Sequence, residues 1–90
     1  NTERLKRVEE LIKEEKALEA RKVFKDIAPE ETVLYYLVKG ALEQKFQNFG
    51  EAINAYSKVL ELDPENISAQ NNLHLIQNIL NFWNPEMFNP

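Results

Sequence analysis

A repeat at an interval of 32 residues is the feature that most constrains how this chain folds. The recurring positions are Ala20, Phe24 and Ile27, which return as Ala52, Tyr56 and Val59. A small residue four positions before an aromatic one places both side chains on one face of an α-helix. Repeats of this length are typical of helical hairpins that cannot bury their apolar faces alone and therefore stack into an array. The interval therefore predicts an all-α array whose natural role is binding.

Apolar residues recur with a 3.6-residue period along most of the chain and predict five helices. The expected ranges are roughly 2–14, 17–28, 30–46, 49–62 and 66–81 or 82. We expect Pro29 to separate the second helix from the third, because proline is tolerated in the first turn of a helix but not in its interior, and Asn48 to cap the fourth. Connections of two or three residues would make successive helices antiparallel neighbours. We also expect Gly40 and Ala52 to lie where the third and fourth helices cross closely.

Length and composition indicate one ordinary globular domain. The chain has 90 residues, of which 43% are hydrophobic and 29% are charged. Its 11 Lys and Arg residues against 15 Asp and Glu residues give a net charge of −4, which repels a phosphate backbone, so we expect no nucleic-acid partner. The chain has no cysteine, which excludes disulfides, thiolate metal sites and a cysteine nucleophile.

No apolar run approaches the roughly 18–20 residues of a membrane span, so we expect no membrane insertion. No signal peptide is visible, and a cytoplasmic location is the expectation. The chain begins at Asn1 and not at a methionine, which leaves open a further segment upstream.

Residues suited to catalysis are too few and too isolated to form a site. The single histidine, His74, has no partner one helical turn away and is expected to be structural, and Ser57 and Ser68 have no paired base. Gly40 and Gly50 are the only glycines, so no phosphate-binding loop is present. We therefore expect no catalytic residue, no metal site, no cofactor and no enzymatic activity.

Residues 33–66 resemble the tetratricopeptide repeat family, whose 34-residue unit follows the pattern W-x₂-L-G-x₂-Y…A-x₃-F…P. The residues that carry this resemblance are Tyr36, Gly40, Ala52, Tyr56 and Pro64. The sequence departs from the pattern where Lys39 replaces the leucine and Glu43 replaces the second aromatic residue.

The rest of the chain resembles the same family more weakly. Residues 1–32 are similar to a degenerate repeat, residues 67–83 to a lone first helix that caps the array, and residues 84–90 form a tail. The resemblance implies about two and a half repeats in a single domain, residues 1–90. The implied fold is a right-handed α-α superhelix of antiparallel helical hairpins.

In the resembled family, the first helices of successive repeats line a concave face. The corresponding positions in the repeat at 33–66 are Leu34, Leu37, Val38, Ala41, Gln44 and Lys45. Those of the last helix are Ser68, Asn71, Asn72, Leu75, Asn78 and Ile79, and those of the first are Thr2, Leu5, Lys6, Glu9, Ile12 and Lys13. The asparagines suit hydrogen bonding to a peptide backbone, since an amide both donates and accepts. Alternatively, Leu37 and Val38 only pack between repeats.

The resemblance implies a non-catalytic protein–protein interaction scaffold that binds a peptide or helix segment in an apolar, asparagine-lined groove. Some family members clamp a C-terminal carboxylate, but the corresponding positions here are Leu5 and Glu9, which would ignore or repel it. We therefore expect an apolar peptide or an amphipathic helix as the partner. The alternative is a structural or self-associating domain that uses its aromatic tail, as a monomer or a weak homodimer.

The aromatic end of the chain is expected to cover the flank of the last helix. Trp83, Met87 and Phe88 are predicted to fold back where a sixth helix would lie. Burial of such side chains contributes about 1.5–3 kcal/mol each. Docking of this tail onto a partner or a second copy, and disorder, are the alternatives.

Overall fold

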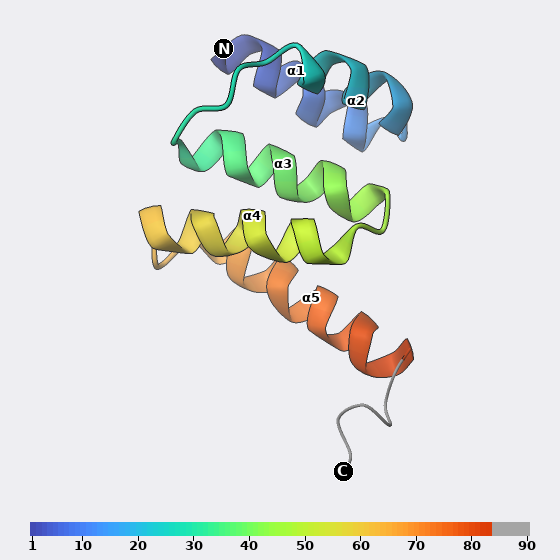
Figure 1. Ribbon diagram of the computed structural model, residues 1–90, viewed down its shortest axis with the longest axis vertical. Coiled ribbons are helices and arrows are strands. Elements are labelled where there is room, and N and C mark those ends of the chain that lie inside the picture. The colour runs from blue at the N-terminus through green and yellow to red at the C-terminus, as the bar shows by residue number, and fades with distance from the viewer. Residues whose placement is uncertain (84–90) are drawn as a thin grey trace.

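The computed structural model describes residues 1–83, with side chains described as far as Phe82. These residues form five α-helices that stack in chain order, each antiparallel to the one before (Figure 1). The helices are α1 (Thr2–Lys13), α2 (Ala17–Lys25), α3 (Val33–Lys45), α4 (Phe49–Leu62) and α5 (Ile67–Trp83). No strand occurs in this part of the chain. The predicted all-α array of helical hairpins is confirmed.

Two turns of the same construction explain the 32-residue interval. Glu15 follows α1 and Gln47 follows α3, and both have left-handed backbone angles, with φ of 62° and 59°. The amide of the residue after each turn residue donates to a carbonyl five positions back, from Lys16 to Leu11 at 2.8 Å and from Asn48 to Glu43 at 2.9 Å. Such bonds satisfy carbonyls that the end of a helix leaves unpaired. Both hairpins therefore reverse in the same way.

The connection between α2 and α3 is longer than predicted. Because α2 ends at Lys25 and α3 begins at Val33, residues 26–32 form the connection, and Pro29 lies in it and not in a helix. Thr32 starts α3, since its backbone is extended and its Oγ1 accepts a hydrogen bond from the Tyr35 amide at 3.2 Å. The expected three-residue connections occur at residues 14–16 and 46–48.

Asparagines precede both α4 and α5, but only one caps its helix through the side chain. Asn66 Oδ1 accepts from the Ala69 amide at 2.9 Å. Asn48 stands at the N-cap of α4 without such a bond, and its Nδ2 donates instead to Glu43 Oε1 at 3.3 Å. The expected capping role of Asn48 is therefore wrong for its side chain.

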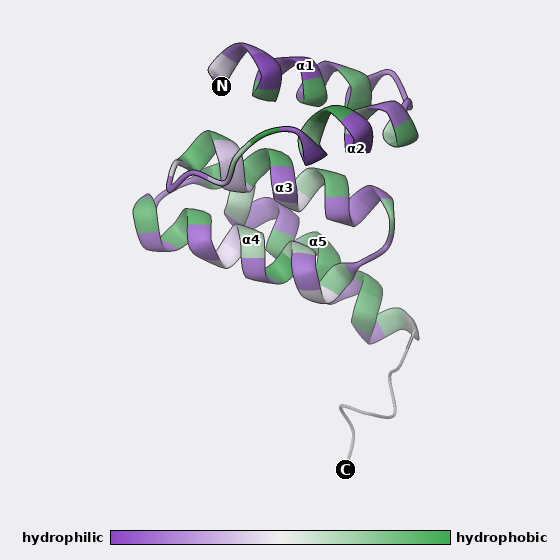
Figure 2. Cartoon of the chain, turned by 45° about the horizontal axis from the view of Figure 1, so that its top comes forward, coloured by the Kyte–Doolittle hydropathy of each residue, from purple (hydrophilic) through white to green (hydrophobic). Residues whose placement is uncertain are grey.

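The helices bury their apolar stripes in two clusters, with polar residues on the opposite faces (Figure 2). The first cluster joins α1, α2 and α3 around Leu5 and Val8, which are fully buried. The second joins α4 and α5 around Tyr56 and Ile76. Tyr36 of α3 packs against both clusters, so α3 is the helix that connects them.

The predicted fold-back of the tail lies outside the described residues, because it concerns Met87, Phe88 and the side chain of Trp83. The flank in question has a shallow hollow of about 310 Å³ between α4 and α5. Ile53, Leu73 and the exposed His74 line it with three further residues. Within residues 1–83, the space beside His74 is therefore open.

The closest approach at Gly40 involves an aromatic ring. A Cβ atom at Gly40 would lie 2.8 Å from both Cε1 and Cζ of Tyr56, and the three nearest atoms all belong to that ring. We expected Ala52 to occupy this position; Ala52 is fully buried, but the glycine accommodates Tyr56. Gly40 therefore allows the Tyr56 ring to lie directly on the backbone of α3.

We predict that Gly40→Ala destabilises the protein by about 1–2 kcal/mol. At a Cβ contact of 2.8 Å with a buried ring, the overpacking cost lies in the upper part of its usual range, about 2–3 kcal/mol, and the roughly 1 kcal/mol by which alanine favours a helix offsets part of it. Gly50→Ala is the matched control, because a Cβ there meets no atom within 4 Å. Urea unfolding of both variants measures the effect. A Gly40→Ala protein as stable as the Gly50→Ala protein would contradict the contact.

Candidate binding groove

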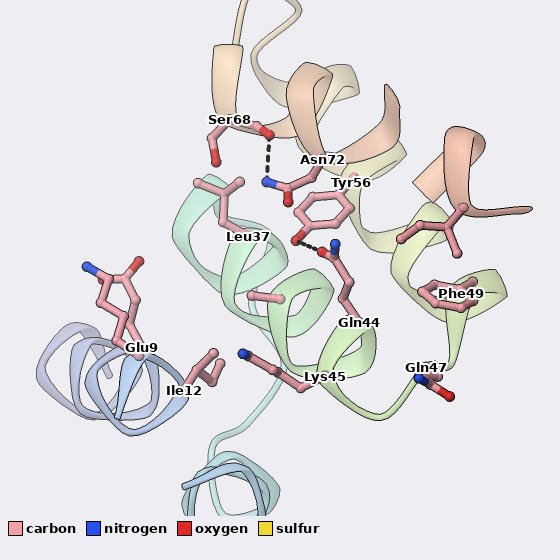
Figure 3. A pocket seen from close by; sticks show the side chains of 13 residues that line it. Glu9, Ile12, Leu37, Gln44, Lys45, Gln47, Phe49, Tyr56, Ser68 and Asn72 are labelled. Carbon is pink, nitrogen blue, oxygen red and sulfur yellow. Dashed lines mark hydrogen bonds between the residues drawn. The ribbon is translucent and has the colours of Figure 1, made fainter. Parts of the chain in front are cut away.

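A hollow of about 580 Å³ lies between α1, α3 and α5, with α4 at its base (Figure 3). We call this hollow the groove. The residues that line it are Glu9, Ile12, Lys13, Leu37, Ala41, Gln44, Lys45, Gln47, Phe49, Tyr56, Ser68, Asn72 and Ile79. The three bordering helices are those that the sequence predicted as the first helices of successive repeats.

Part of the predicted peptide-binding set lines the groove. The predicted positions found there are Leu37, Ala41 and Lys45 of α3 and Asn72 of α5, together with Gln44, Ser68, Ile79, Glu9, Ile12 and Lys13 from the wider concave set. Leu37 is half-buried, packs against the second cluster and also borders the open space. A role of these residues in peptide binding stays a prediction.

The remaining predicted residues lie elsewhere. Val38 is 1% exposed and packs in the first cluster, as the packing alternative proposed. Leu34 also packs against that cluster. Asn71, Leu75 and Asn78 are exposed on α5 and do not line the groove. The groove therefore uses one edge of α5, the edge of Ser68, Asn72 and Ile79.

Three lining residues were not predicted: Gln47, Phe49 and Tyr56. Gln47 lies in the turn between α3 and α4, and Phe49 is the first residue of α4. Neither is a position of a first helix, which is where the family pattern places the residues of the concave face. Tyr56 was assigned to packing between helices, where phenylalanine is the family residue. The signal was the hydroxyl group, because a buried tyrosine needs a hydrogen-bond partner and must reach a polar surface to find it.

That partner is Gln44. The Tyr56 hydroxyl donates to Gln44 Oε1 at 2.9 Å, at the base of the groove (Figure 3). The ring is 1% exposed, and burial raises the pKa of Tyr56 to about 12, so the hydroxyl keeps its proton and stays a donor at neutral pH. This hydrogen bond orients the Gln44 side chain, so that its Nε2 group points away from the Tyr56 hydroxyl.

The Asn72 side chain is oriented by its own helix. Its Nδ2 donates to the backbone carbonyl oxygen of Ser68 at 2.8 Å (Figure 3). Within residues 1–83, neither Asn72 Oδ1 nor Gln44 Nε2 has a hydrogen-bond partner in the protein. The groove therefore presents one acceptor on α5 and one donor group on α3.

Charges on the groove are mixed and nearly balanced. Lys45 Nζ lies 3.0 Å and 3.2 Å from the two carboxylate oxygens of Glu15, which neutralise it. Glu9 and Lys13, one turn apart on α1, carry opposite charges, and neither forms an ion pair with another described residue. An exposed mixture of this kind gives little preference for a strongly charged ligand.

Among residues 1–83, no group of three or more His, Asp or Glu side chains is placed to hold a metal ion. None of the helices in that range is both long and apolar enough to cross a bilayer. Besides its charged residues, the groove presents amides, the Tyr56 hydroxyl and the Ser68 hydroxyl, which bind by hydrogen bonding. The arrangement suits recognition of a ligand.

A comparison with protein families identifies residues 47–78 with the TPR repeat. The match covers α4 and most of α5, which are the second helix of the repeat at 33–66 and the lone helix that follows. The predicted resemblance to tetratricopeptide repeats is confirmed. No curated protein and no solved structure matches the chain.

All three tyrosines hold their protons more tightly than usual. Burial raises the pKa of Tyr35, and the hydrogen bond that Tyr36 donates to Glu31 raises the pKa of Tyr36 to about 12 and lowers that of Glu31. The unfolded chain loses these protons near pH 10. The raised pKa values therefore contribute to the free energy of unfolding. This contribution is complete below about pH 9 and is lost as the pH rises from 10 to 12.

We accordingly predict that the free energy of unfolding falls steeply between pH 10 and 12. Urea unfolding over this range, together with the near-ultraviolet absorbance of phenolate, measures the effect. The Tyr36→Phe/Tyr56→Phe double variant is the control and should lose most of the decline. Phenolate that forms near pH 10 in the still-folded protein would contradict the prediction.

Proposed function

We propose that this tetratricopeptide repeat chain is a non-catalytic scaffold that binds a segment of another protein in the groove. Tetratricopeptide repeat proteins are generally protein–protein interaction scaffolds. The observation that carries the proposal is the coincidence of the groove with the first helices of the array, α1, α3 and α5. A cytoplasmic location is compatible with this function and is proposed with it.

The groove supports binding because its apolar side chains are only partly covered. Leu37, Ala41 and Ile79 are half-buried and border the hollow. A ligand that covers apolar surface gains about 25 cal/mol for each Å² removed from water. The lining includes no nucleophile paired with a base, so binding and not chemistry is the function that this surface favours.

The ligand in this proposal is an internal segment and not a chain end. Leu5, at one of the family's carboxylate-clamp positions, is fully buried and out of reach of a ligand. Glu9, at the other, lines the groove with a negative charge. A carboxylate there would meet repulsion, whereas an uncharged segment of the chain would not.

Self-association is the second candidate. Leu75 of α5 is 50% exposed and Ile67 is 69% exposed, and large apolar side chains at a surface support contact between copies. The two candidates differ in stoichiometry and therefore in mass.

For peptide binding, we predict that Ser68→Arg and Ala41→Arg each lower the affinity of groove-binding peptides at least about tenfold, because a long charged side chain occupies the space. The probes are peptides selected from a random phage-displayed library against the wild-type protein. Leu18→Arg is the matched control, since Leu18 is 67% exposed on α2 and lies outside the groove. Circular dichroism verifies folding. Peptides that bind both groove variants as tightly as the control would contradict the proposal.

For self-association, we expect sedimentation equilibrium to give a mass that rises with protein concentration. Leu75→Glu should abolish that rise, because charges repel across a symmetric contact. A monomer mass that is constant over the concentration range would eliminate this second candidate.

A further inference from the structure

We propose that one face of α5 binds a second copy of this chain, with the two α5 helices antiparallel about a two-fold axis. This outer face consists of Ile67, Asn71, Leu75, Asn78 and Phe82, which are all exposed. The inference concerns a surface apart from the groove. It rests on the second candidate of the proposed function, self-association, and specifies which residues meet.

The outer face lies along one side of α5, opposite the side that packs in the protein. Its residues follow one another at intervals of four, four, three and four, which is the spacing of a single helical face. Ala69 and Ile76, which are fully buried, lie on the opposite side, where α5 packs on α4 (Figure 1). In the part of the chain that the structure describes, the outer face is therefore the surface at which the stack of helices ends.

The composition of α5 is that of an interface. The helix has no Lys, Arg, Asp or Glu residue, whereas each of the other four helices in residues 1–83 has several. Depletion of charged residues distinguishes the centre of a protein interface from the rest of a protein surface. An exposed helix with apolar and amide side chains but no such charge is therefore suited to being covered.

A second copy is the occupant that an uncharged face favours. Each copy carries a net charge of −4, so two copies repel each other where their acidic surfaces approach. At α5, two copies meet without placing like charges together. A partner of a different sequence would instead gain from opposite charges, and the outer face offers none.

The outer face has the same order of apolar and amide residues from either end. Asn71 and Asn78 lie equally far from its middle, and so do Ile67 and Phe82. An axis through that middle therefore places Asn71 opposite Asn78 of the partner subunit. It places Ile67 opposite Phe82 of the partner subunit, and Leu75 meets its own counterpart beside the axis. Amide meets amide and apolar meets apolar along the whole face.

The asparagines and the helix ends both suit the antiparallel arrangement. An amide has a donor and an acceptor, so Asn71 and Asn78 of the partner subunit can exchange hydrogen bonds at both ends of the contact. α5 has no acidic residue in its first turn and no basic residue in its last, so its own side chains leave the helix dipole without compensation. An antiparallel partner helix brings the opposite partial charge beside each end.

The size of the outer face predicts a weak dimer. A helix of 17 residues is about 25 Å long and about 10 Å wide, so one face of it covers far less than the roughly 800 Å² that each partner buries in a stable complex. We therefore expect a dissociation constant of about 10 μM to 1 mM.

Sedimentation equilibrium of the full chain at up to about 1 mM tests whether the outer face forms the dimer. We expect the mass to rise towards that of two chains. Leu75→Glu should raise the dissociation constant at least about tenfold, because two like charges then meet beside the axis. Leu18→Glu adds the same charge at an exposed position of α2 and, as the matched control, should dimerise like the wild type. Circular dichroism verifies folding.

Disulfide trapping tests which residues meet, and the chain has no cysteine of its own to interfere. Asn71→Cys and Asn78→Cys proteins are mixed in equal amounts and oxidised, one of them labelled with a heavy nitrogen isotope so that mass spectrometry identifies each dimer. Helices in contact bring opposed Cα atoms to about 4–6 Å, which a disulfide spans. We expect the mixed dimer to exceed either homodimer at least about fivefold, and Leu18→Cys to remain largely monomeric.

The outcomes separate the levels of the argument. A constant monomer mass, as expected if residues 84–90 or a different protein cover the face, would overturn self-association and this inference but leave the groove as the proposed binding site. A rise in mass that Leu75→Glu leaves unchanged would place the contact elsewhere and overturn the inference alone. A predominance of Asn71→Cys homodimers would show parallel helices and overturn the antiparallel pairing.

Discussion

The contact between Gly40 and the Tyr56 ring is the constraint on which the rest of the structure depends. The ring occupies the space that a side chain at position 40 would need, so α3 and α4 approach at the distance of a ring lying on a backbone. The same ring carries a hydroxyl that reaches Gln44 at the base of the groove. One residue pair therefore determines both how the central hairpin packs and which polar groups the groove presents.

The repeated turns explain why the array forms from so short a chain. Glu15 and Gln47 adopt the same left-handed conformation 32 residues apart, so the first and second hairpins reverse alike. Only glycine and occasionally asparagine visit this conformation readily, and for other residues it is unfavourable. The unfavourable conformation is offset by the packing of the helices, since Ala20 and Ala52, each five positions after its turn residue, are both completely buried.

Sequence reasoning was most successful where periodicity decides the structure. It predicted the bounds of α4 correctly and identified α1, α3 and α5 as the helices that border a groove. It failed at residues 26–32, because whether the helix begins near Glu30 or after Thr32 depends on a hydrogen bond that Thr32 Oγ1 accepts from a single backbone amide. It also missed Tyr56 as a groove residue, because a helical pattern reports which face a side chain occupies and not which atom its hydroxyl reaches. Such partners are determined by tertiary packing.

The width of the groove is set indirectly, by way of α4, which forms its base. α1 packs on α3 through the first cluster, and α5 packs on α4 through the second. Gln44 on α3 and Asn72 on α5 are consequently held in relation to each other by way of α4, which contacts both of their helices. The exposed ion pairs, such as Lys58 with Glu31 at 3.6 Å, contribute too little to fix this geometry. A change in the packing of Tyr56 against Gly40 would therefore alter the position of Gln44 relative to Asn72, and with it the shape of the groove.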